Sequence, residues 1–127
     1  MHRDSAFNVA NRLIRLAERK HNVKYQIKGL LLTERCYRAS QTNFPKALRV
    51  NYRLLSLIET APQAYGGYFW RVYRNLGNIS NSLGEYGEAV AFLQKSIAWF
   101  GKDRKEDAIR LADLHQFLAD AYKRQTS

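Results

Sequence analysis

The side chains that could do chemistry in this sequence are few and widely spaced. His2, His21 and His115 stand far apart, with no cysteine or second histidine at the spacing that a metal site needs. The single cysteine, Cys36, has no histidine near it in sequence and lies in a stretch of helical pattern. Packing in a core explains such a cysteine better than nucleophilic catalysis does. We therefore expect no metal site.

Two further groups deserve the same test. Asp103, Glu106 and Asp107 form a cluster of carboxylates, but they open a predicted helix, where the helix dipole favours negative charge. The pair Gly66-Gly67 lacks the glycine, lysine and hydroxyl residues that complete a phosphate-binding loop. The sequence therefore predicts neither an enzyme nor a cofactor.

The charge of the chain is high and unevenly placed. Residues 1–60 carry twelve lysines and arginines against four acidic residues, a net charge of +8, whereas residues 61–127 carry nine against seven, a net charge of +2. A basic half can attract an acidic partner or nucleic acid, although without a compact basic run it is explained as well by solvated helix faces. No apolar run approaches the roughly 18 residues of a membrane span. One cysteine suits a reducing compartment, so we expect a cytoplasmic protein without membrane contact.

The hydrophobic pattern predicts an all-α protein, because no stretch alternates for long as a strand would. The expected helices cover residues 5–20, 23–40, 44–60, 70–83, 86–100 and 104–124. Asp4 or Ser5 is placed to cap the first, Pro45 suits a first turn, and Asp103 and Glu106 have the spacing of a capping box. Residues 62–67 are predicted to form a loop, and most of the tryptophans and tyrosines to lie in the core.

Residues 70–101 predict the clearest structural unit, two amphipathic helices joined by a short turn. Gly84 can adopt the left-handed conformation that closes the first helix. Gly77 and Ala89 are the small residues, one in each helix. Small side chains allow two helix backbones to approach closely, so we expect these residues to lie against each other.

The same residues resemble the tetratricopeptide repeat (TPR). Leu76-Gly77, Gly84, Tyr86 and Ala89 stand at that family's offsets for its small, aromatic and turn residues. Further residues of the chain match the same pattern, namely Phe44, Ala47, Ala119 and Tyr122. Ala47 precedes Ala89, and Gly77 precedes Ala119, by 42 residues, which is longer than the usual unit of about 34. Long repeats of this kind are similar to those of kinesin light chains and bacterial signalling proteins.

The resemblance implies a fold and a layout. The fold would be a right-handed α-solenoid of antiparallel helix pairs with about six helices. A half repeat at 5–20, repeats at 24–60 and 67–100, and a half repeat at 104–124 would make one TPR-like domain. Because the pattern begins and ends in mid-repeat, we expect either a fragment of a longer array, which we favour, or an array whose end helices act as caps. The terminal helices of a fragment would expose apolar faces that could pair two copies as a homo-oligomer.

The resemblance also implies a function, that of a scaffold for protein–protein interaction within a signalling or regulatory protein. The first helix of each pair would line a concave groove that binds a peptide, acidic or ending in a carboxylate, or a partner helix. Carried over by position, the groove residues of the main repeat are Arg71, Arg74, Asn78, Asn81 and Ser82. The earlier repeat offers Cys36 and Ala39, or Arg35 and Arg38 if the register shifts by one, and the last helix offers Asp113, Gln116 and Asp120. Arg74 and Asn78 lie four apart, as in the carboxylate clamp of chaperone-binding members. The alternative is a basic helical repeat that binds nucleic acid, which is disfavoured because basic and aromatic residues do not alternate.

Overall fold

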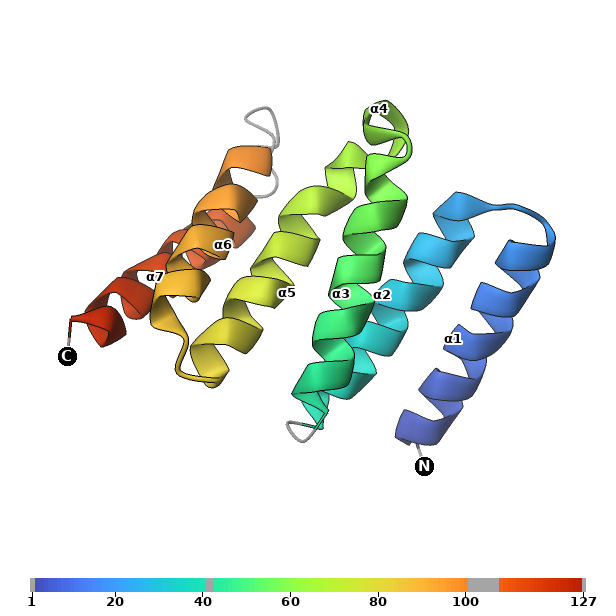
Figure 1. Ribbon diagram of the computed structural model, residues 1–127, viewed down its shortest axis with the longest axis horizontal. Helices are drawn as coiled ribbons and strands as arrows, with labels where there is room; N and C mark the ends of the chain where they lie inside the picture. The colour runs from blue at the N-terminus through green and yellow to red at the C-terminus, as the bar shows by residue number, and fades with distance from the viewer. Residues whose placement is uncertain (1, 41–42, 101–107, 127) are drawn as a thin grey trace. The chain divides into compact units, whose positions relative to one another are not determined.

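The computed structural model describes residues 2–40, 43–100 and 108–126, with side chains from residue 6 onward (Figure 1). Throughout these ranges the regular structure is helical and there is no strand, which confirms the all-α prediction. The six long helices are α1 (His2–Arg19), α2 (Val23–Ala39), α3 (Phe44–Glu59), α5 (Phe69–Ser82), α6 (Tyr86–Trp99) and α7 (Ala108–Gln125). Two short elements follow α3, namely α4 (Pro62–Tyr65) and the 3₁₀ helix η1 (Gly66–Tyr68).

The helices form two compact units. Unit 1 comprises residues 1–65 and unit 2 comprises residues 66–127. In unit 1, α2 packs against both α1 and α3, and in unit 2, α6 packs against both α5 and α7. Neighbouring long helices within a unit run antiparallel (Figure 1). The division falls between the predicted repeats at 24–60 and 67–100.

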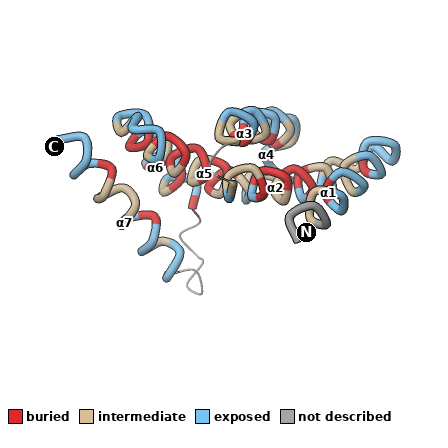
Figure 2. Tube along the Cα trace, turned by 90° about the horizontal axis from the view of Figure 1, so that it is seen from below, coloured by how far each residue is buried: buried red, intermediate tan, exposed pale blue. Residues whose placement is uncertain are grey.

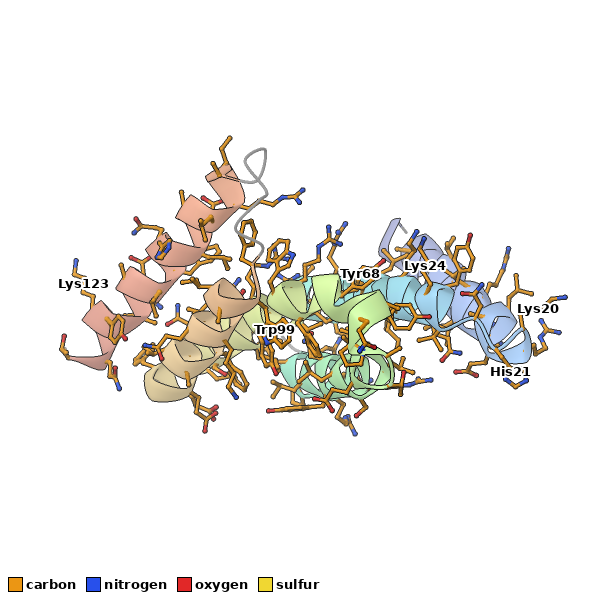
Figure 3. The ribbon with its side chains drawn as sticks, turned by 90° about the horizontal axis from the view of Figure 1, so that it is seen from above. Lys20, His21, Lys24, Tyr68, Trp99 and Lys123 are labelled. Atoms are coloured by element: carbon orange, nitrogen blue, oxygen red, sulfur yellow. The ribbon has the colours of Figure 1, made fainter. Side chains whose placement is uncertain are left out.

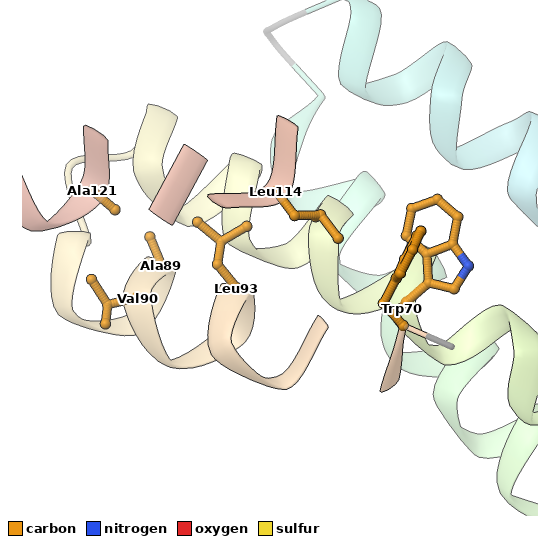
Figure 4. Packing of buried hydrophobic residues seen from close by; sticks show 7 residues of the cluster. Trp70, Ala89, Val90, Leu93, Leu114 and Ala121 are labelled. Carbon is orange, nitrogen blue, oxygen red and sulfur yellow. The ribbon is translucent and has the colours of Figure 1, made fainter. Parts of the chain in front are cut away.

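The core of unit 2 forms around the crossing of α5 and α6. A Cβ atom at Gly77 would lie 2.7 Å from Leu93 Cγ and 3.4 Å from the carbonyl oxygen of Ala89, so the two helices meet at distances that only glycine permits. The predicted contact between Gly77 and Ala89 is confirmed. Figure 4 shows the apolar cluster built on this crossing, which comprises Trp70, Ala89, Val90, Leu93, Phe100, Leu114 and Ala121. α7 contributes two of these residues and is buried along one side only (Figure 2).

The turn between α5 and α6 is closed by Gly84, as the sequence predicts. Its φ angle is +80°. The N–H of Gly84 donates to the carbonyl of Asn81 at 3.1 Å, and the N–H of Glu85 donates to the carbonyl of Ser80 at 2.8 Å. These two bonds form a Schellman motif, which satisfies the last carbonyl groups of α5.

In unit 1, a close approach of α1 and α2 depends on a glycine that the repeat pattern does not include. A Cβ atom at Gly29 would lie 2.7 Å from Ile14 Cγ1 and 3.3 Å from the carbonyl oxygen of Ala10. Ala10 is fully buried at this crossing. Gly29 therefore allows α1 and α2 to pack closely, as Gly77 does for α5 and α6.

The turn between α1 and α2 has the same geometry as the Gly84 turn, but with histidine in the left-handed position. His21 has a φ angle of +53°. Its N–H donates to the carbonyl of Glu18 at 3.2 Å, and the N–H of Asn22 donates to the carbonyl of Ala17 at 2.7 Å. Asn22 Oδ1 then caps α2 by accepting the N–H of Tyr25 at 3.2 Å. A side chain disfavours this conformation, so the tight turn carries strain at His21.

A buried polar cluster joins α2 to α3. Glu34 is 1% exposed; it accepts Arg38 Nε at 3.0 Å and Asn51 Nδ2 at 3.0 Å. Asn51 is fully buried and also donates to the carbonyl of Ala47 at 2.9 Å. Glu34 and Asn51 precede the core residues Leu76 and Leu93 by 42 positions. The hydrogen-bonded pair Glu34–Asn51 in unit 1 therefore occupies the positions that the apolar pair Leu76 and Leu93 occupies in unit 2.

Some predicted boundaries are wrong. α1 begins at His2 rather than at residue 5, and the side chains of residues 4 and 5, predicted as caps, lie outside the described residues. Residues 62–67 form α4 and the start of η1 instead of a loop, because Pro62 opens a helical turn in which its missing N–H costs nothing. The predicted capping box at residues 103–106 also lies outside the described part of the chain.

Several aromatic side chains assigned to the core lie at the surface. Trp99 is 48% exposed, although its ring packs against Phe69 at a centroid distance of 4.5 Å. Tyr25, Tyr52 and Tyr122 are also exposed. Amphipathic rings bury one face and leave the other in water, which helical spacing alone does not reveal. Val9 and Leu16 are exposed as well, so the apolar face of α1 is only partly covered.

Candidate recognition surface

A row of polar side chains runs along α5 in unit 2. Arg71, Arg74, Asn78 and Asn81 follow one another at intervals of three, four and three residues, which places them on one helix face. All four are half-buried, and Ser82 at the end of the helix is exposed. We call these four residues the α5 row.

Trp70 contacts both arginines at the N-terminal end of the α5 row. The guanidinium carbons of Arg71 and Arg74 lie 5.8 Å and 5.2 Å from the centroid of its ring, within the range of cation–π attraction. The indole is 2% exposed and meets Phe100 edge-on at 5.1 Å. Ser96 Oγ donates to the Trp70 carbonyl at 2.6 Å and ties this turn of α5 to α6. One fixed ring therefore positions two cations.

Arg74 is held by a second contact. Its Nη2 donates to Asn75 Oδ1 at 3.4 Å, and Asn75 is itself 2% exposed. Arg71 makes no ion pair with any acidic residue that the structure describes. The positive charge of Arg71 is therefore not neutralised by a carboxylate of the described chain.

At the C-terminal end of the α5 row, one hydrogen-bond acceptor has no partner. Asn81 Oδ1 is buried and has no hydrogen-bond partner. Leaving a buried polar atom unpaired costs about 1–3 kcal/mol, so such atoms are rare in folded proteins. Because this oxygen is buried, a ligand would reach it only after rotation of the Asn81 side chain.

The remaining predicted groove residues lie elsewhere and are differently engaged. Arg35 is exposed on α2, while Arg38 is bound to the buried carboxylate of Glu34. Gln116 Nε2 donates to Asp120 Oδ1 on its own helix at 3.1 Å. Arg38 thus serves the core of unit 1, and among the predicted residues only Arg71 and Arg74 are brought together around one group.

The repeat residues predicted in α7 differ from those in α5. Ala119 is exposed, whereas Gly77, 42 positions earlier, is buried. Tyr122 is 43% exposed, and its hydroxyl accepts Gln94 Nε2 at 2.6 Å, which ties α7 to α6. In the other helices, Leu76, Ala47 and Ala89 are buried, and Phe44 and Tyr86 are half-buried.

Sequence reasoning missed Trp70 as the platform for the α5 row. The available signal was spacing, since Arg71 is adjacent to Trp70 and Arg74 lies one helical turn after it. It also missed the unsatisfied Asn81, which no sequence pattern reveals.

Other chemistries find little support within the described ranges. No group of three or more histidine, cysteine or acidic side chains comes together there as a metal site would require. Cys36 is a buried free thiol, as expected for a core residue. None of the described helices combines the length and apolar character that crossing a membrane demands.

Comparison with known proteins leaves the resemblance as a prediction. No family model, curated protein or solved structure matches this chain.

Proposed function

We propose that this chain is a protein-recognition scaffold with the architecture of a TPR-like α-solenoid. The support is a burial pattern that repeats at 42 residues. The four buried positions of α3, which are Ala47, Asn51, Leu54 and Ile58, precede by 42 residues the buried Ala89, Leu93 and Ser96 of α6 and its C-cap residue Phe100. Val90 is buried in α6 as well, but its counterpart Leu48 is only half-buried. The buried Leu114 and Ala121 of α7 likewise follow the buried Val72 and Ile79 of α5 by 42 residues. Similar helices packed through equivalent positions are what a repeat array requires.

The α5 row is the proposed recognition surface, and its ligand is a peptide that presents a carboxylate. Arg71 and Arg74 donate charge-assisted hydrogen bonds to that carboxylate. Asn78 bonds to the peptide backbone, and Asn81 does so once its side chain rotates outward. The observation that carries this proposal is the pair of guanidinium groups held over the Trp70 ring.

Preorganisation explains why this row suits binding better than other basic residues do. Arginine loses considerable rotamer freedom when it is fixed by a ligand, and that loss weakens binding. Stacking on a buried indole restricts both guanidinium groups before the ligand arrives. Most other arginines of the described chain, such as Arg124 on α7, are exposed without such a platform. On the TPR resemblance and the lone buried Cys36, we place this activity in a signalling or regulatory protein of the cytoplasm.

A binding assay with a defined probe tests the proposal. The probe is an unlabelled short peptide without acidic side chains that ends in a free carboxylate, with binding followed by calorimetry, and its amidated form is the control ligand. We expect Arg74→Ala to weaken binding roughly tenfold or more, the loss of a charge-assisted hydrogen bond, while Arg124→Ala on α7 has little effect. Equal affinity of the free and amidated peptides for the wild-type chain would contradict the proposal.

Salt dependence separates this mode from nucleic-acid binding. A ligand held through one or two carboxylates should lose little affinity between 50 and 200 mM salt, because few charges are screened. Binding that neutralises 6–10 phosphates falls by about 10³–10⁵ over the same range. Steep salt dependence together with an unchanged Arg74→Ala variant would replace the α5 row with the basic surface of unit 1.

A further inference from the structure

An apolar cavity lies between α1 and α2, at the end of the hairpin that these helices form. Its volume is about 220 Å³. It is lined by Leu13, Leu16, Ala17, Lys20, Asn22 and Tyr25. Figure 3 shows Lys20 and His21 at the tip of this hairpin and Lys24 at the start of α2. The cavity belongs to unit 1 and shares no residue with the α5 row.

The lining of the cavity is mostly apolar. Leu16 and Tyr25 remain 49% and 47% exposed, so two large apolar side chains border the opening. Asn22 Oδ1 is occupied by the N–H of Tyr25, and Lys28 lies over the Tyr25 ring at 5.6 Å. The cavity therefore favours an apolar group over a polar one.

A basic row borders the cavity. Arg12, Arg15 and Arg19 are spaced three and four residues apart on one face of α1, and together with Leu16 and Glu18 they line a hollow of about 700 Å³. Leu16 is common to both hollows. These three arginines form no ion pair with any carboxylate of the described chain.

Glu18, the carboxylate that the described part of the chain contributes to this hollow, does not neutralise the basic row. Glu18 Oε1 accepts Arg53 Nη2 from α3 at 2.8 Å. The surface around the cavity therefore carries an excess of positive charge beside an apolar recess.

We propose that this surface binds a segment of another protein that carries one bulky apolar side chain flanked by acidic residues. The apolar side chain fills the cavity, and the acidic residues pair with Arg12, Arg15 and Arg19. The apolar cavity, at about 220 Å³, is smaller than the roughly 300–1,000 Å³ of small-molecule sites. An apolar side chain inserted into such a recess is typical of protein interfaces. Charge complementarity identifies the flanking residues as acidic. This site is independent of the proposed α5 site.

Three other occupants fit less well. A second copy of the chain has a net charge of +10, so pairing through this surface would oppose like charges. A lipid surface is bound by apolar side chains that enter it rather than by a recess. Nucleic acid uses aromatic platforms for its bases, and Tyr25, the aromatic residue that the described chain contributes to the lining, already has Lys28 over its ring.

The test uses the ¹⁵N-labelled full chain and a short peptide with blocked termini, in which a central leucine is flanked by glutamates. Two control peptides replace the leucine by alanine or the glutamates by glutamine. We expect amide shifts at the cavity lining, such as those of Leu16, Ala17 and Tyr25, that persist in the Arg74→Ala chain, and binding at this site roughly tenfold weaker for each control peptide. Equal binding of the alanine peptide, or no shift at millimolar peptide, would overturn the proposal.

Matched variants test the two parts of the surface. Leu16→Ser should weaken binding about tenfold and Leu83→Ser should not, although the two leucines are similarly exposed, at 49% and 45%. Arg15→Gln should weaken binding, whereas Arg49→Gln, an exposed arginine of α3, should leave it unchanged. Because these side chains are exposed, circular dichroism and Tm should stay at wild-type values.

The competing occupants give distinct results. An oligonucleotide that bound more tightly than the peptide, with affinity unchanged by Leu16→Ser, would assign the surface to nucleic acid. Vesicles containing phosphatidylserine that bound the chain through Leu16 would assign it to membranes. A dimer in sedimentation that Leu16→Ser abolished would assign it to a second copy. Each of these outcomes overturns the proposal, and Arg74→Ala should leave peptide binding here intact.

Discussion

Adding a single methyl group at Gly77 should disturb the centre of unit 2. The new Cβ of Gly77→Ala would lie 2.7 Å from Leu93 Cγ and 2.9 Å from Leu93 Cδ2, and Leu93 is fully buried. Alanine gains about 1 kcal/mol over glycine in a helix interior. Overpacking a core costs about 1–3 kcal/mol, so the net loss in unfolding free energy should be about 0–2 kcal/mol.

A double-mutant cycle isolates this contact. Leu93→Ala alone should cost about 2–5 kcal/mol, because it leaves a cavity. In that background the Gly77 methyl group no longer meets a side chain, so Gly77→Ala should stabilise by about 1 kcal/mol. The coupling energy between the two positions should therefore be about 1–3 kcal/mol.

Urea denaturation followed by far-UV circular dichroism measures these values. The control is Gly87→Ala in α6, where a Cβ would meet only Gln125 Nε2 at an ordinary 3.4 Å. That variant should be stabilised by up to about 1 kcal/mol. If Gly77→Ala stabilised the wild-type chain as much as Gly87→Ala does, the close crossing of α5 and α6 would be refuted.

Three further predictions concern other local features. His21 and Gly84 have φ angles of +53° and +80°, so His21→Gly should raise the unfolding free energy by about 0.5–1 kcal/mol and Gly84→Ala should lower it by about 1 kcal/mol. Changes in unfolding free energy of the same sign for both variants, measured by denaturation, would contradict this. Glu34 and Asn51 can be replaced together by leucine, which is the residue found 42 positions later in each case. This double variant should have an unchanged unfolding free energy or one raised by about 1–4 kcal/mol, whereas Arg38→Ala alone should lower it. Loss of cooperative unfolding in the double variant would show that the cores of the two units are not equivalent. The pKa of Glu85 is raised by its hydrogen bond to Glu88 and by the negative charge of Glu88. The folded chain therefore binds this proton more tightly than the unfolded chain, and the stability due to this site increases as the pH falls through the raised pKa. The unfolding free energy of Glu85→Gln should exceed that of the wild type by more at pH 7 than at pH 4, and a difference independent of pH would contradict this.

Local patterns made much of the fold predictable. The helices, the left-handed Gly84 and the contact of Gly77 with the helix of Ala89 follow from periodicity and from the conformational freedom of glycine. Such signals lie within a few residues of one another. The start of α1 and the helical turns after Pro62 were missed because helix ends depend on weak local preferences.

The features that depend on tertiary contacts were not predictable in the same way. Glu34 and Asn51 are 17 residues apart, and polar side chains at those positions give no sign that they bond in the core. The two arginines on Trp70 could be suspected from spacing, but the burial of the indole and the missing partner of Asn81 depend on packing between helices. The α1–α2 cavity likewise exists only because Leu16 and Tyr25 come together across a turn.

The most direct test of the proposed function observes the Arg74 guanidinium itself. Its Nε–Hε resonance can be followed by ¹⁵N NMR while the free-carboxylate peptide is titrated into the full chain, with Arg74→Ala used to assign the signal. We predict that this resonance shifts with the free-carboxylate peptide and stays in place with the amidated peptide, because the carboxylate bonds to a guanidinium positioned over Trp70. A free-carboxylate peptide that bound and shifted other amides while the Arg74 resonance stayed unchanged would contradict the account.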